Sequence, residues 1–263
     1  MNILLSEHAG FCFGVRRAVE LLESRLSEGK KIYTLGHIIH NEDFNADLER
    51  RGVVCVSPEE LDRVEKDALV LIRTHGVTRD TVKRLEEHGL DYLDATCPFV
   101  KKIHNIVLEE ERKALLSGEK IAFVLLGDPT HPEVQGIVSC AEHFPVAVIN
   151  SCEELISYEK TADREARHIF LSQTTHSVSE WERCCERARE VFSRLSFFDT
   201  ICSVTGIRQK EARSIAEKSD LVESWAAKKA VTPKSWFRCA KRFAKPFISE
   251  MRRNCRERSL ERI

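Results

Sequence analysis

The sequence lacks the features of several common protein classes. Its longest apolar run, IAFVLLG at 121–127, is far shorter than the roughly 20 residues that a membrane-spanning helix needs. The N-terminal stretch MNILLSEHAG has no basic segment followed by a long apolar one, so we expect no secretory signal. The chain has ten cysteines, and without a secretory signal we expect free thiols and a cytoplasmic location instead of a disulfide framework.

Several short motifs are also missing. Neither GxGxxG nor GxxxxGK[ST] occurs, which argues against a dinucleotide-binding fold and a P-loop. No CxxC is present, which argues against zinc-ribbon, thioredoxin and bacterial ferredoxin spacings. A metal site built from cysteines would therefore have to gather residues that lie far apart along the chain.

Charge is distributed unevenly although the net value is −1 over 263 residues. Residues 221–263 hold 12 Lys and Arg against four Asp and Glu, whereas 1–220 hold 29 against 38. One interpretation of the basic tail is an arm that binds RNA or DNA. A second, developed below, is that the tail is not an evolved part of the protein.

Short apolar runs alternate with charged amphipathic segments along the chain. This alternation predicts an α/β fold with parallel sheets, arranged as small units at 1–97, 98–200 and 201–263. The expected helices cover 15–28, 78–88, 99–117 and 177–195. The expected strands cover 2–5, 31–36, 52–56, 68–72, 91–95, 121–126, 146–149 and 168–172.

Polar side chains follow four of the expected strands. Ligands of open α/β sheets bind at the carboxyl ends of the strands, so these positions are candidates for chemistry. The residues are His37, His40 and Asn41 after 31–36, His75 after 68–72, His131 and Glu133 after 121–126, and Gln173, Thr174 and Thr175 after 168–172.

Five of the ten cysteines are predicted to have no chemical role. Cys55, Cys140 and Cys152 lie in or beside apolar or helical segments, where a free cysteine is typically a small buried hydrophobe. Cys184 and Cys185 are adjacent on an expected helix and point in different directions, so we interpret both as incidental.

Cys12, Cys97 and Cys202 differ because each follows a strand-like run and precedes a helix. A helix N-terminus lowers the pKa of a thiol and favours the thiolate, which binds metals. Three dispersed thiolates can hold zinc or an iron–sulfur cluster, and three ligands instead of four leave one metal position open for substrate. The residues alone leave this choice open.

Seven motifs, in order, give the chain a family resemblance. They are GFCFGV, HIIHN, THGV, DATCPFV, HPEVQG, SQTT and DTICSVTGIRQ. Together they resemble the 4-hydroxy-3-methylbut-2-enyl diphosphate reductases, which catalyse the last step of the methylerythritol phosphate route to isoprenoids. The resemblance covers residues 1 to about 220.

This resemblance implies a trefoil of three small α/β units around a [4Fe–4S] cluster held by Cys12, Cys97 and Cys202, with the fourth iron facing the substrate. It implies single electrons from ferredoxin or flavodoxin. It also implies that His40, His75 and His131 bind the diphosphate, that Glu133 supplies a proton and that Thr174 contributes near the substrate hydroxyl. The reaction is a reductive dehydroxylation that gives isopentenyl and dimethylallyl diphosphate.

The chain departs from the family pattern near residue 221. The family carries a GKKSSNT-like turn whose serines and asparagine complete the diphosphate site, where this chain has AAKKAVTPKSW. Codons for 226–237, taken one nucleotide earlier, can encode Gly-Lys-Lys-Ser-Ser-Asn-Thr. We therefore expect a frameshift near 221–224 that leaves the third unit incomplete and turnover weak or absent.

Two other functions remain as alternatives. A zinc-dependent hydrolase would use Cys12, Cys97 and Cys202 as ligands and Glu133 as the base. A non-catalytic RNA-binding protein would use the basic tail on an α/β body, and its affinity would depend strongly on salt. Neither alternative accounts for the four strand-end motifs together, so we expect neither nucleic acid nor a membrane as partner.

Overall fold

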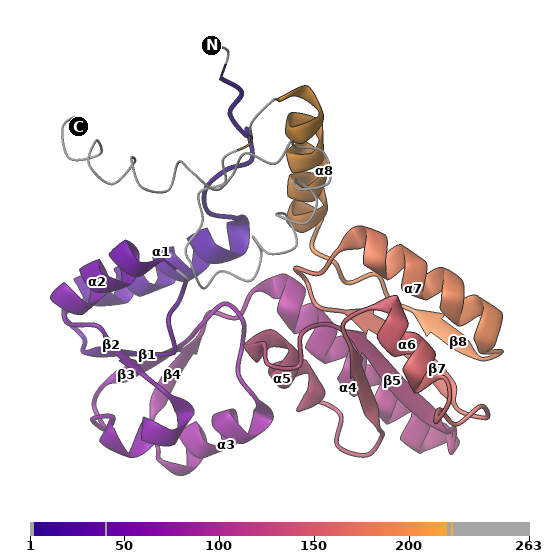
Figure 1. The fold of residues 1–263 in the computed structure, drawn as a ribbon. Coiled ribbons are helices and arrows are strands. Elements are labelled where there is room, and N and C mark those ends of the chain that lie inside the picture. The colour runs from indigo at the N-terminus through magenta and orange to yellow at the C-terminus, as the bar shows by residue number, and fades with distance from the viewer. Residues whose placement is uncertain (1–2, 40, 220–221, 223–263) are drawn as a thin grey trace. The chain divides into compact units, whose positions relative to one another are not determined.

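The computed structural model describes residues 3–39, 41–219 and 222 (Figure 1). Gly10–Gly206 forms one compact unit, and Met1–Ala9 groups with Ile207–Ile263 in a second. In the first unit the chain forms two four-stranded sheets, and every strand pairing is parallel. The expected α/β class with parallel sheets is therefore confirmed.

The first sheet has the strand order β2-β1-β3-β4. Residues Leu35 of β1 and Ile72 of β3 are paired at its carboxyl end. Since the chain moves from β1 to β2 on one side and then to β3 on the other, the order reverses between β1 and β3. The elements are α1 (Phe13–Ser27), β1 (Ile32–Leu35), α2 (Glu42–Arg50), β2 (Val54–Val56), the 3-10 helix η1 (Pro58–Arg63), β3 (Leu69–Ile72), α3 (Arg79–Glu87) and β4 (Asp91–Asp94).

The second sheet repeats this winding with the order β6-β5-β7-β8. Leu126 of β5 pairs with Ser172 of β7 at the carboxyl end, where the order again reverses. The elements are α4 (Pro98–Ser117), β5 (Ile121–Leu126), α5 (Pro132–Val138), β6 (Val146–Ile149), α6 (Cys152–Tyr158), β7 (Arg167–Ser172), α7 (Val178–Val191) and β8 (Leu195–Phe197), followed by α8 (Ser203–Lys218).

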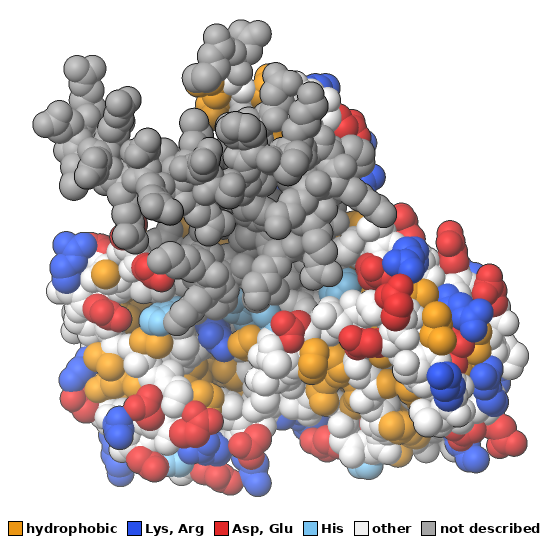
Figure 2. Space-filling model, in the orientation of Figure 1, with side chains coloured by type: hydrophobic (Ala, Val, Ile, Leu, Met, Phe, Trp, Pro, Cys, Tyr) orange, Lys and Arg blue, Asp and Glu red, His pale blue; other side chains and the backbone are white. Residues whose placement is uncertain are grey.

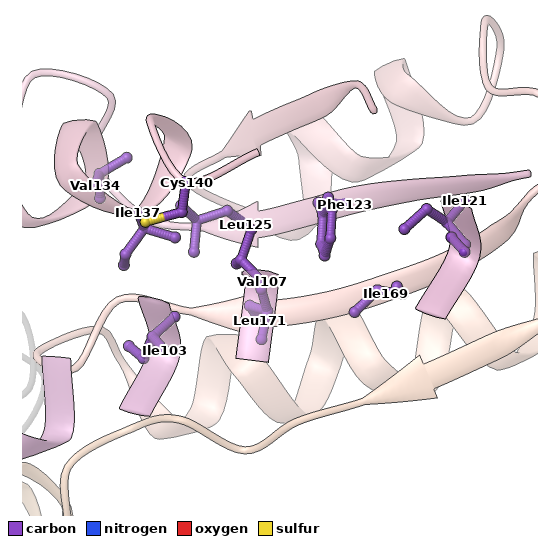
Figure 3. Close-up of a cluster of buried hydrophobic side chains, with 11 residues drawn as sticks. Ile103, Val107, Ile121, Phe123, Leu125, Val134, Ile137, Cys140, Ile169 and Leu171 are labelled. Atoms are coloured by element: carbon purple, nitrogen blue, oxygen red, sulfur yellow. The ribbon is translucent and has the colours of Figure 1, made fainter. Parts of the chain in front are cut away.

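Helices cover both faces of each sheet, so the central strands are buried on two sides. On the second sheet, Phe123 packs with α4 and α5 on one face, whereas Phe170 packs with α6 and α7 on the other. Figure 3 shows the first of these clusters, in which side chains of α4 and α5 meet alternate residues of β5 and β7. In the first sheet, α1 and α2 pack on one face and η1 and α3 on the other.

Local signals determine where most helices begin. Asn41, Thr78, Ser151 and Ser177 are the N-caps of α2, α3, α6 and α7, and each side chain accepts a hydrogen bond from a backbone N–H in the first turn. Cysteine occupies the N-cap position of α1 and of α4 instead. These two helices therefore begin at a thiol where a capping oxygen would be the ordinary choice.

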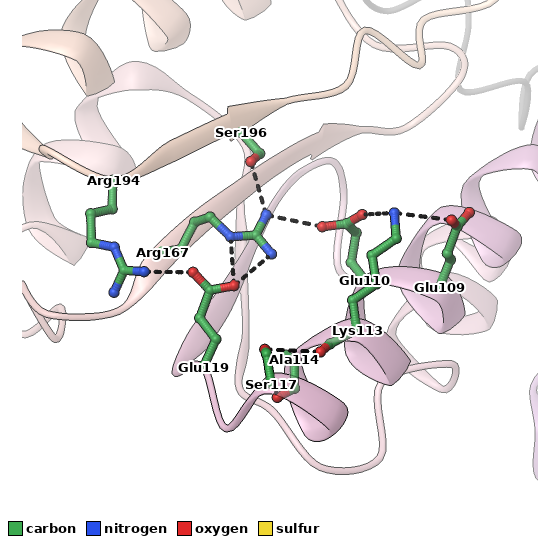
Figure 4. Close-up of polar contacts among 9 residues, drawn as sticks. All are labelled: Glu109, Glu110, Lys113, Ala114, Ser117, Glu119, Arg167, Arg194 and Ser196. Atoms are coloured by element: carbon green, nitrogen blue, oxygen red, sulfur yellow. Dashed lines mark hydrogen bonds and ion pairs between the residues drawn. The ribbon is translucent and has the colours of Figure 1, made fainter.

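An ion-pair network lies at the amino ends of β5 and β7, opposite the strand ends that carry the candidate site. Arg167 contacts both Glu110 and Glu119, and Arg194 contacts Glu119 at 2.6 Å (Figure 4). Across the face shown in Figure 2, acidic and basic side chains are interspersed. The network joins α4 to the second sheet away from the candidate chemistry.

Two expectations about secondary structure are wrong, and one strand was not expected. Residues 3–5 of the expected strand 2–5 form no strand; Ile3 and Leu5 are largely exposed, at 69% and 83%, and no described strand pairs with them. The helix expected to reach residue 195 ends at Val191. Leu195–Phe197 form β8 because they pair with β7.

In the second compact unit, the described residues meet at Glu211 on α8. Its carboxylate accepts hydrogen bonds from the Ser6 hydroxyl at 2.6 Å and from the Glu7 backbone N–H at 2.7 Å. These contacts lower the pKa of Glu211. Among the described helices of the whole chain, none is both long and apolar enough to cross a membrane.

Candidate functional site

Three cysteines occupy the same place in three different helices. Each lies directly before the first helical residue, and its carbonyl oxygen accepts the first intrahelical hydrogen bond. The bonds are Arg16 N–H to Cys12 at 3.0 Å, Lys101 N–H to Cys97 at 3.0 Å and Gly206 N–H to Cys202 at 3.1 Å. All three side chains are half-buried.

Two of these cysteines are attached to the carboxyl ends of the sheets. The backbone N–H of Cys97 donates to the carbonyl of Thr74, two residues after β3, at 2.9 Å. The backbone N–H of Cys202 donates to the carbonyl of Thr174, two residues after β7, also at 2.9 Å. Each thiol is therefore held at the end of the sheet where ligands bind in this class of fold.

The third cysteine approaches the other two through Gly14. A Cβ atom on Gly14 would lie only 2.6 Å from the sulfur of Cys97, so α1 packs directly against that thiol. Charge repulsion from Cys12 and Cys202 also raises the pKa of Cys97. The structure therefore brings near one another three thiols that are 85 and 105 residues apart in the sequence.

The expected lowering of the thiol pKa is wrong for Cys97. Burial is the largest cause and raises its pKa, whereas the backbone N–H groups of Phe99 and Val100 at the start of α4 only partly offset this effect. Desolvation of a thiolate here outweighs the helix N-terminus. A bound cation would supply the compensating charge, because metal coordination favours the thiolate.

The donor set of the site is three cysteine thiols, and thiolates are the usual ligands of iron–sulfur clusters. Among the described residues, no group of three His, Cys, Asp or Glu side chains is arranged to hold one metal ion. A cluster accepts each thiolate on a different iron, so its ligands need not meet at one atom. The missing side chain of Gly14 lets α1 lie against the sulfur of Cys97.

A buried carboxyl and a threonine link the segments after β5 and β7, the two neighbouring strands between which the order of the second sheet reverses. Glu133 lies in the first turn of α5, after β5, and Thr174 follows β7. The Thr174 backbone N–H donates to Glu133 Oε1 at 2.6 Å, and its hydroxyl donates to Oε2 at 2.8 Å. Because Thr174 also accepts the N–H of Cys202, the carboxyl is tied to the cysteine site.

The environment of Glu133 changes its protonation. Only 1% of the residue is exposed, and desolvation raises its pKa to about 7 although both hydrogen bonds from Thr174 lower it. A carboxyl with a pKa close to neutral is suited to give and take a proton. Next to it, His131 is the N-cap of α5 and accepts the Glu133 backbone N–H at 3.2 Å.

Two of the candidate histidines lie together. The rings of His75, after β3, and His131, after β5, are edge to face with their centroids 5.1 Å apart. The structure thus brings a strand end of the first sheet to one of the second. His40 lies outside the described residues, and His37 is exposed.

The remaining described cysteines behave as predicted for packing residues. Cys140, Cys152, Cys184 and Cys185 are buried in hydrophobic clusters, and burial raises the pKa of each. Cys55 is half-buried, and its pKa is raised for the same reason. High thiol pKa values oppose nucleophilic or metal-binding roles.

Sequence reasoning missed the contribution of glycines at close approaches. Gly14 lies within α1, and its missing side chain makes room for Cys97. Gly127, directly after β5, is similar: its Cβ would lie 2.7 Å from a methyl carbon of Val134 and 3.1 Å from Cβ of Gln173. The only sequence signal was the position of each glycine beside a chemical residue.

Comparisons with known proteins place the chain in a family. The LytB protein family matches residues 3–235. Two relatives named 4-hydroxy-3-methylbut-2-enyl diphosphate reductase, from Caldanaerobacter subterraneus subsp. tengcongensis and Thermoanaerobacter sp., are each 39% identical over 227 and 224 residues. Each alignment covers 84% of this chain and 74% of the relative.

Solved structures are also similar to this chain. The chain is similar to a structure of (E)-4-hydroxy-3-methyl-but-2-enyl diphosphate reductase, with a TM-score of 0.67 and 30% identity over 92% of this chain and 83% of that one. The reductase from Plasmodium falciparum gives a TM-score of 0.78 at 24% identity, covering 88% and 70%. These likenesses confirm the expected α/β trefoil class, although its third unit lies mostly outside the described residues. By its sequence and its fold, the chain belongs to the LytB protein family.

Proposed function

We propose that this chain reduces (E)-4-hydroxy-3-methylbut-2-enyl diphosphate to isopentenyl diphosphate and dimethylallyl diphosphate, the last step of the methylerythritol phosphate pathway. Two electrons and two protons enter, the allylic C–O bond breaks, and water leaves. Membership of the LytB family and the names of the relatives support this reaction.

The observation that carries the proposal is the buried pair of Glu133 and Thr174. Breaking an allylic C–O bond requires a proton donor, because hydroxide is a poor leaving group. Glu133 is held by two hydrogen bonds and has a pKa of about 7, so a large fraction of the carboxyl carries a proton at neutral pH. The Thr174 hydroxyl keeps the carboxyl oriented and contributes a second polar group beside the substrate oxygen.

The histidines supply the proposed diphosphate site. His75 and His131 come from strand ends of different sheets, and their rings are in contact. Imidazole N–H groups donate hydrogen bonds to phosphate oxygens. His40, outside the described residues, completes this group of histidines in the proposal.

Cys12, Cys97 and Cys202 would hold the cofactor. A [4Fe–4S] cluster bound by three thiolates carries single electrons and offers one iron without a protein ligand as a Lewis acid. The chain itself contributes the three helix N-termini, the close approach of α1 to Cys97 at Gly14 and the hydrogen bond from Cys202 to Thr174. Ferredoxin or flavodoxin is the proposed electron donor.

The third unit is proposed to be incomplete. The basic segment 221–263 lies almost entirely outside the described residues, and in the sequence it replaces the serines and asparagine of the family turn. Missing donors to the diphosphate would weaken substrate binding. We therefore propose weak turnover and a labile cluster, caused by a frameshift. A gene sequence that cannot encode Ser-Ser-Asn-Thr in the neighbouring frame contradicts the frameshift.

The deciding experiment is anaerobic purification followed by iron and sulfide analysis and a reductant-driven assay with product identification. We expect a brown protein with iron and sulfide and slow formation of both diphosphate products. A colourless protein with bound zinc and hydrolytic activity would support the alternative hydrolase. Salt-sensitive RNA binding that is lost on deletion of 221–263 would support the binding protein.

A further inference from the structure

His104 lies where three parts of the proposed site meet. It is on α4, two turns after Cys97, so both side chains lie on the same face of the helix. Its ring also reaches the backbone that follows His75 and the helix that carries Glu133.

Two glycines hold the ring between them. A Cβ on Gly76, the residue after His75, would lie 3.4 Å from the Cε1 atom of His104. A Cβ on Gly136, one helical turn after Glu133 on α5, would lie 3.4 Å from its Nε2 atom. The imidazole therefore lies beside both glycines, where the loop after His75 meets α5; a Cβ on Gly136 would also lie 3.3 Å from the carbonyl oxygen of Val77 in that loop.

The surroundings of His104 include a cavity. Its ring lines a space of about 110 Å³ together with residues of α3 and α4 and with Cys140, which follows α5, so the ring is not fully enclosed by packed side chains. Its Nε2 atom is fully buried and has no hydrogen-bond partner among the described residues. Such an atom is not specific to this site, because both ring nitrogens of His168 are also buried without a partner among the described residues, so the inference rests on the two glycines and the cavity.

We propose that His104 is a positioning residue, which holds the loop of His75 at a fixed distance from α5, the helix that is capped by His131 and carries Glu133. The inference rests on the proposed function, in which one substrate must reach both groups. The diphosphate end is held by the histidines, and the C–O bond must then fall beside Glu133. A shift of about 1 Å in such an arrangement lowers a rate by up to about 100-fold.

The test compares His104→Ala with His168→Ala. His168 is the matched control, because its buried ring packs within an aromatic cluster, 4.0 Å from the ring of Phe192, near the amino end of β7. Both changes leave a cavity and lower stability. Only His104→Ala is expected to lower kcat, by about tenfold or more, with KM altered less, because the substrate stays bound but out of register.

A second measurement does not depend on turnover. The His75 and His131 rings shield each other at 5.1 Å, so their ring proton signals in the NMR spectrum of labelled full chain report their spacing. We expect both signals to move in His104→Ala and neither to move in His168→Ala. His104→Gln, which keeps a nitrogen near the position of Nε2 and preserves more volume, should restore most of the parental signals and kcat; it also serves if the alanine variant fails to fold.

The outcomes separate the two proposals. If the parent chain has no reductase activity but the histidine signals respond as expected, the proposed function fails and the positioning role stands. If the parent is active and His104→Ala, or His104→Gln where the alanine variant does not fold, leaves kcat and both signals unchanged, the positioning role is overturned. Equal effects of the two alanine variants on kcat would also overturn it, because they would indicate general destabilisation.

Discussion

The first sheet and the second sheet share a framework but carry different chemical groups. In each, an N-cap cysteine begins a helix, the helix leads into the strand at which the order reverses, and the last strand leads to the next cysteine. Even the turn before that cysteine repeats. Asp94 and Asp199, three residues before Cys97 and Cys202, each accept a backbone N–H two residues later, at 2.8 and 3.2 Å.

The difference lies in the side chains after the strands. The first sheet presents His75 after β3, whereas the second presents His131 and Glu133 after β5 and Thr174 after β7. The repeated part of the two sheets supplies the thiols. In our proposal, the side chains that differ supply the other functions: histidines of both sheets bind the diphosphate, and the second sheet alone supplies the proton donor. The two sheets thus have the same strand order, while the side chains after their strands have different proposed roles in the reaction.

The largest expected effect follows from removing the proton donor that only the second sheet has. Glu133→Gln keeps the shape and loses the proton, so turnover should fall about 100- to 10,000-fold. Glu111→Gln is the control, because Glu111 is also buried and accepts the backbone N–H of His143 at 2.7 Å. Steady-state assays measure both, and a Glu133→Gln enzyme as fast as the control would contradict the division between sheets.

The shared framework is tested at Gly14. In Gly14→Ala the new methyl group would overlap the sulfur of Cys97, so the purified chain should lose most of its iron and sulfide. Gly206→Ala is the matched control. Gly206 lies in the first turn after Cys202, but a Cβ atom there would meet nothing closer than 4.0 Å. Equal iron in the two variants would show that the thiols do not act as one site.

Stability should vary with pH because of Glu133. Its pKa is 4.5 in an unfolded chain and about 7 when folded, so between these values the folded chain holds a proton that the unfolded chain has lost. The free energy of unfolding should therefore fall by up to about 3 kcal/mol as the pH rises from 4.5 through 7. Denaturation across this range measures the slope, which must be smaller in Glu133→Gln if the assignment is correct.

A smaller effect is expected from Thr174→Val. This change removes one of two hydrogen bonds that lower the pKa of Glu133, so the pH above which turnover declines should move upward. Turnover itself should fall about tenfold, the equivalent of one hydrogen bond to a charged group. In Thr200→Val the lost hydroxyl bonds only the Ser172 backbone, so its pH profile should match the parent.

The smallest effect should come from the ion-pair network away from the strand carboxyl ends. Arg194 is half exposed, so Arg194→Ala should lower stability by no more than about 1 kcal/mol and leave turnover and iron content unchanged. Thermal unfolding and the assay together test this. A loss of activity here would mean that the amino ends of the strands also take part in the chemistry.

Much of the framework could be predicted from local patterns. Runs such as IAFVLL at 121–126 and VAVI at 146–149 are β-branched, apolar and bounded by turn residues, and both became strands with the expected limits. The short helices α2, α5 and α6 were not assigned, because seven to nine residues give little periodicity. The nine-residue helix α3 was assigned as a charged segment between two apolar runs. The division into units at 1–97, 98–200 and 201–263 stays a prediction.

The site could be predicted only in part. Strand ends identified His75, Glu133 and Thr174 as candidates, because topology alone determines where such residues gather. The contact of Glu133 with Thr174 and the approach of Gly14 to Cys97 depend on distances between segments that are 41 and 83 residues apart, which no local pattern encodes. The burial that reverses the expected pKa of Cys97 also arises from packing.

The spacing of the three cysteines has a consequence for synthesis. A ribosome adds about 5–20 residues each second, so Cys202 emerges about 5–20 s after Cys97. During that interval Cys12 and Cys97 can already approach each other while the third thiol is still absent. The nascent chain therefore passes through a stage in which the thiols of Cys12 and Cys97 are present without that of Cys202. In that stage, oxidation of these two thiols would prevent the three-cysteine site from forming.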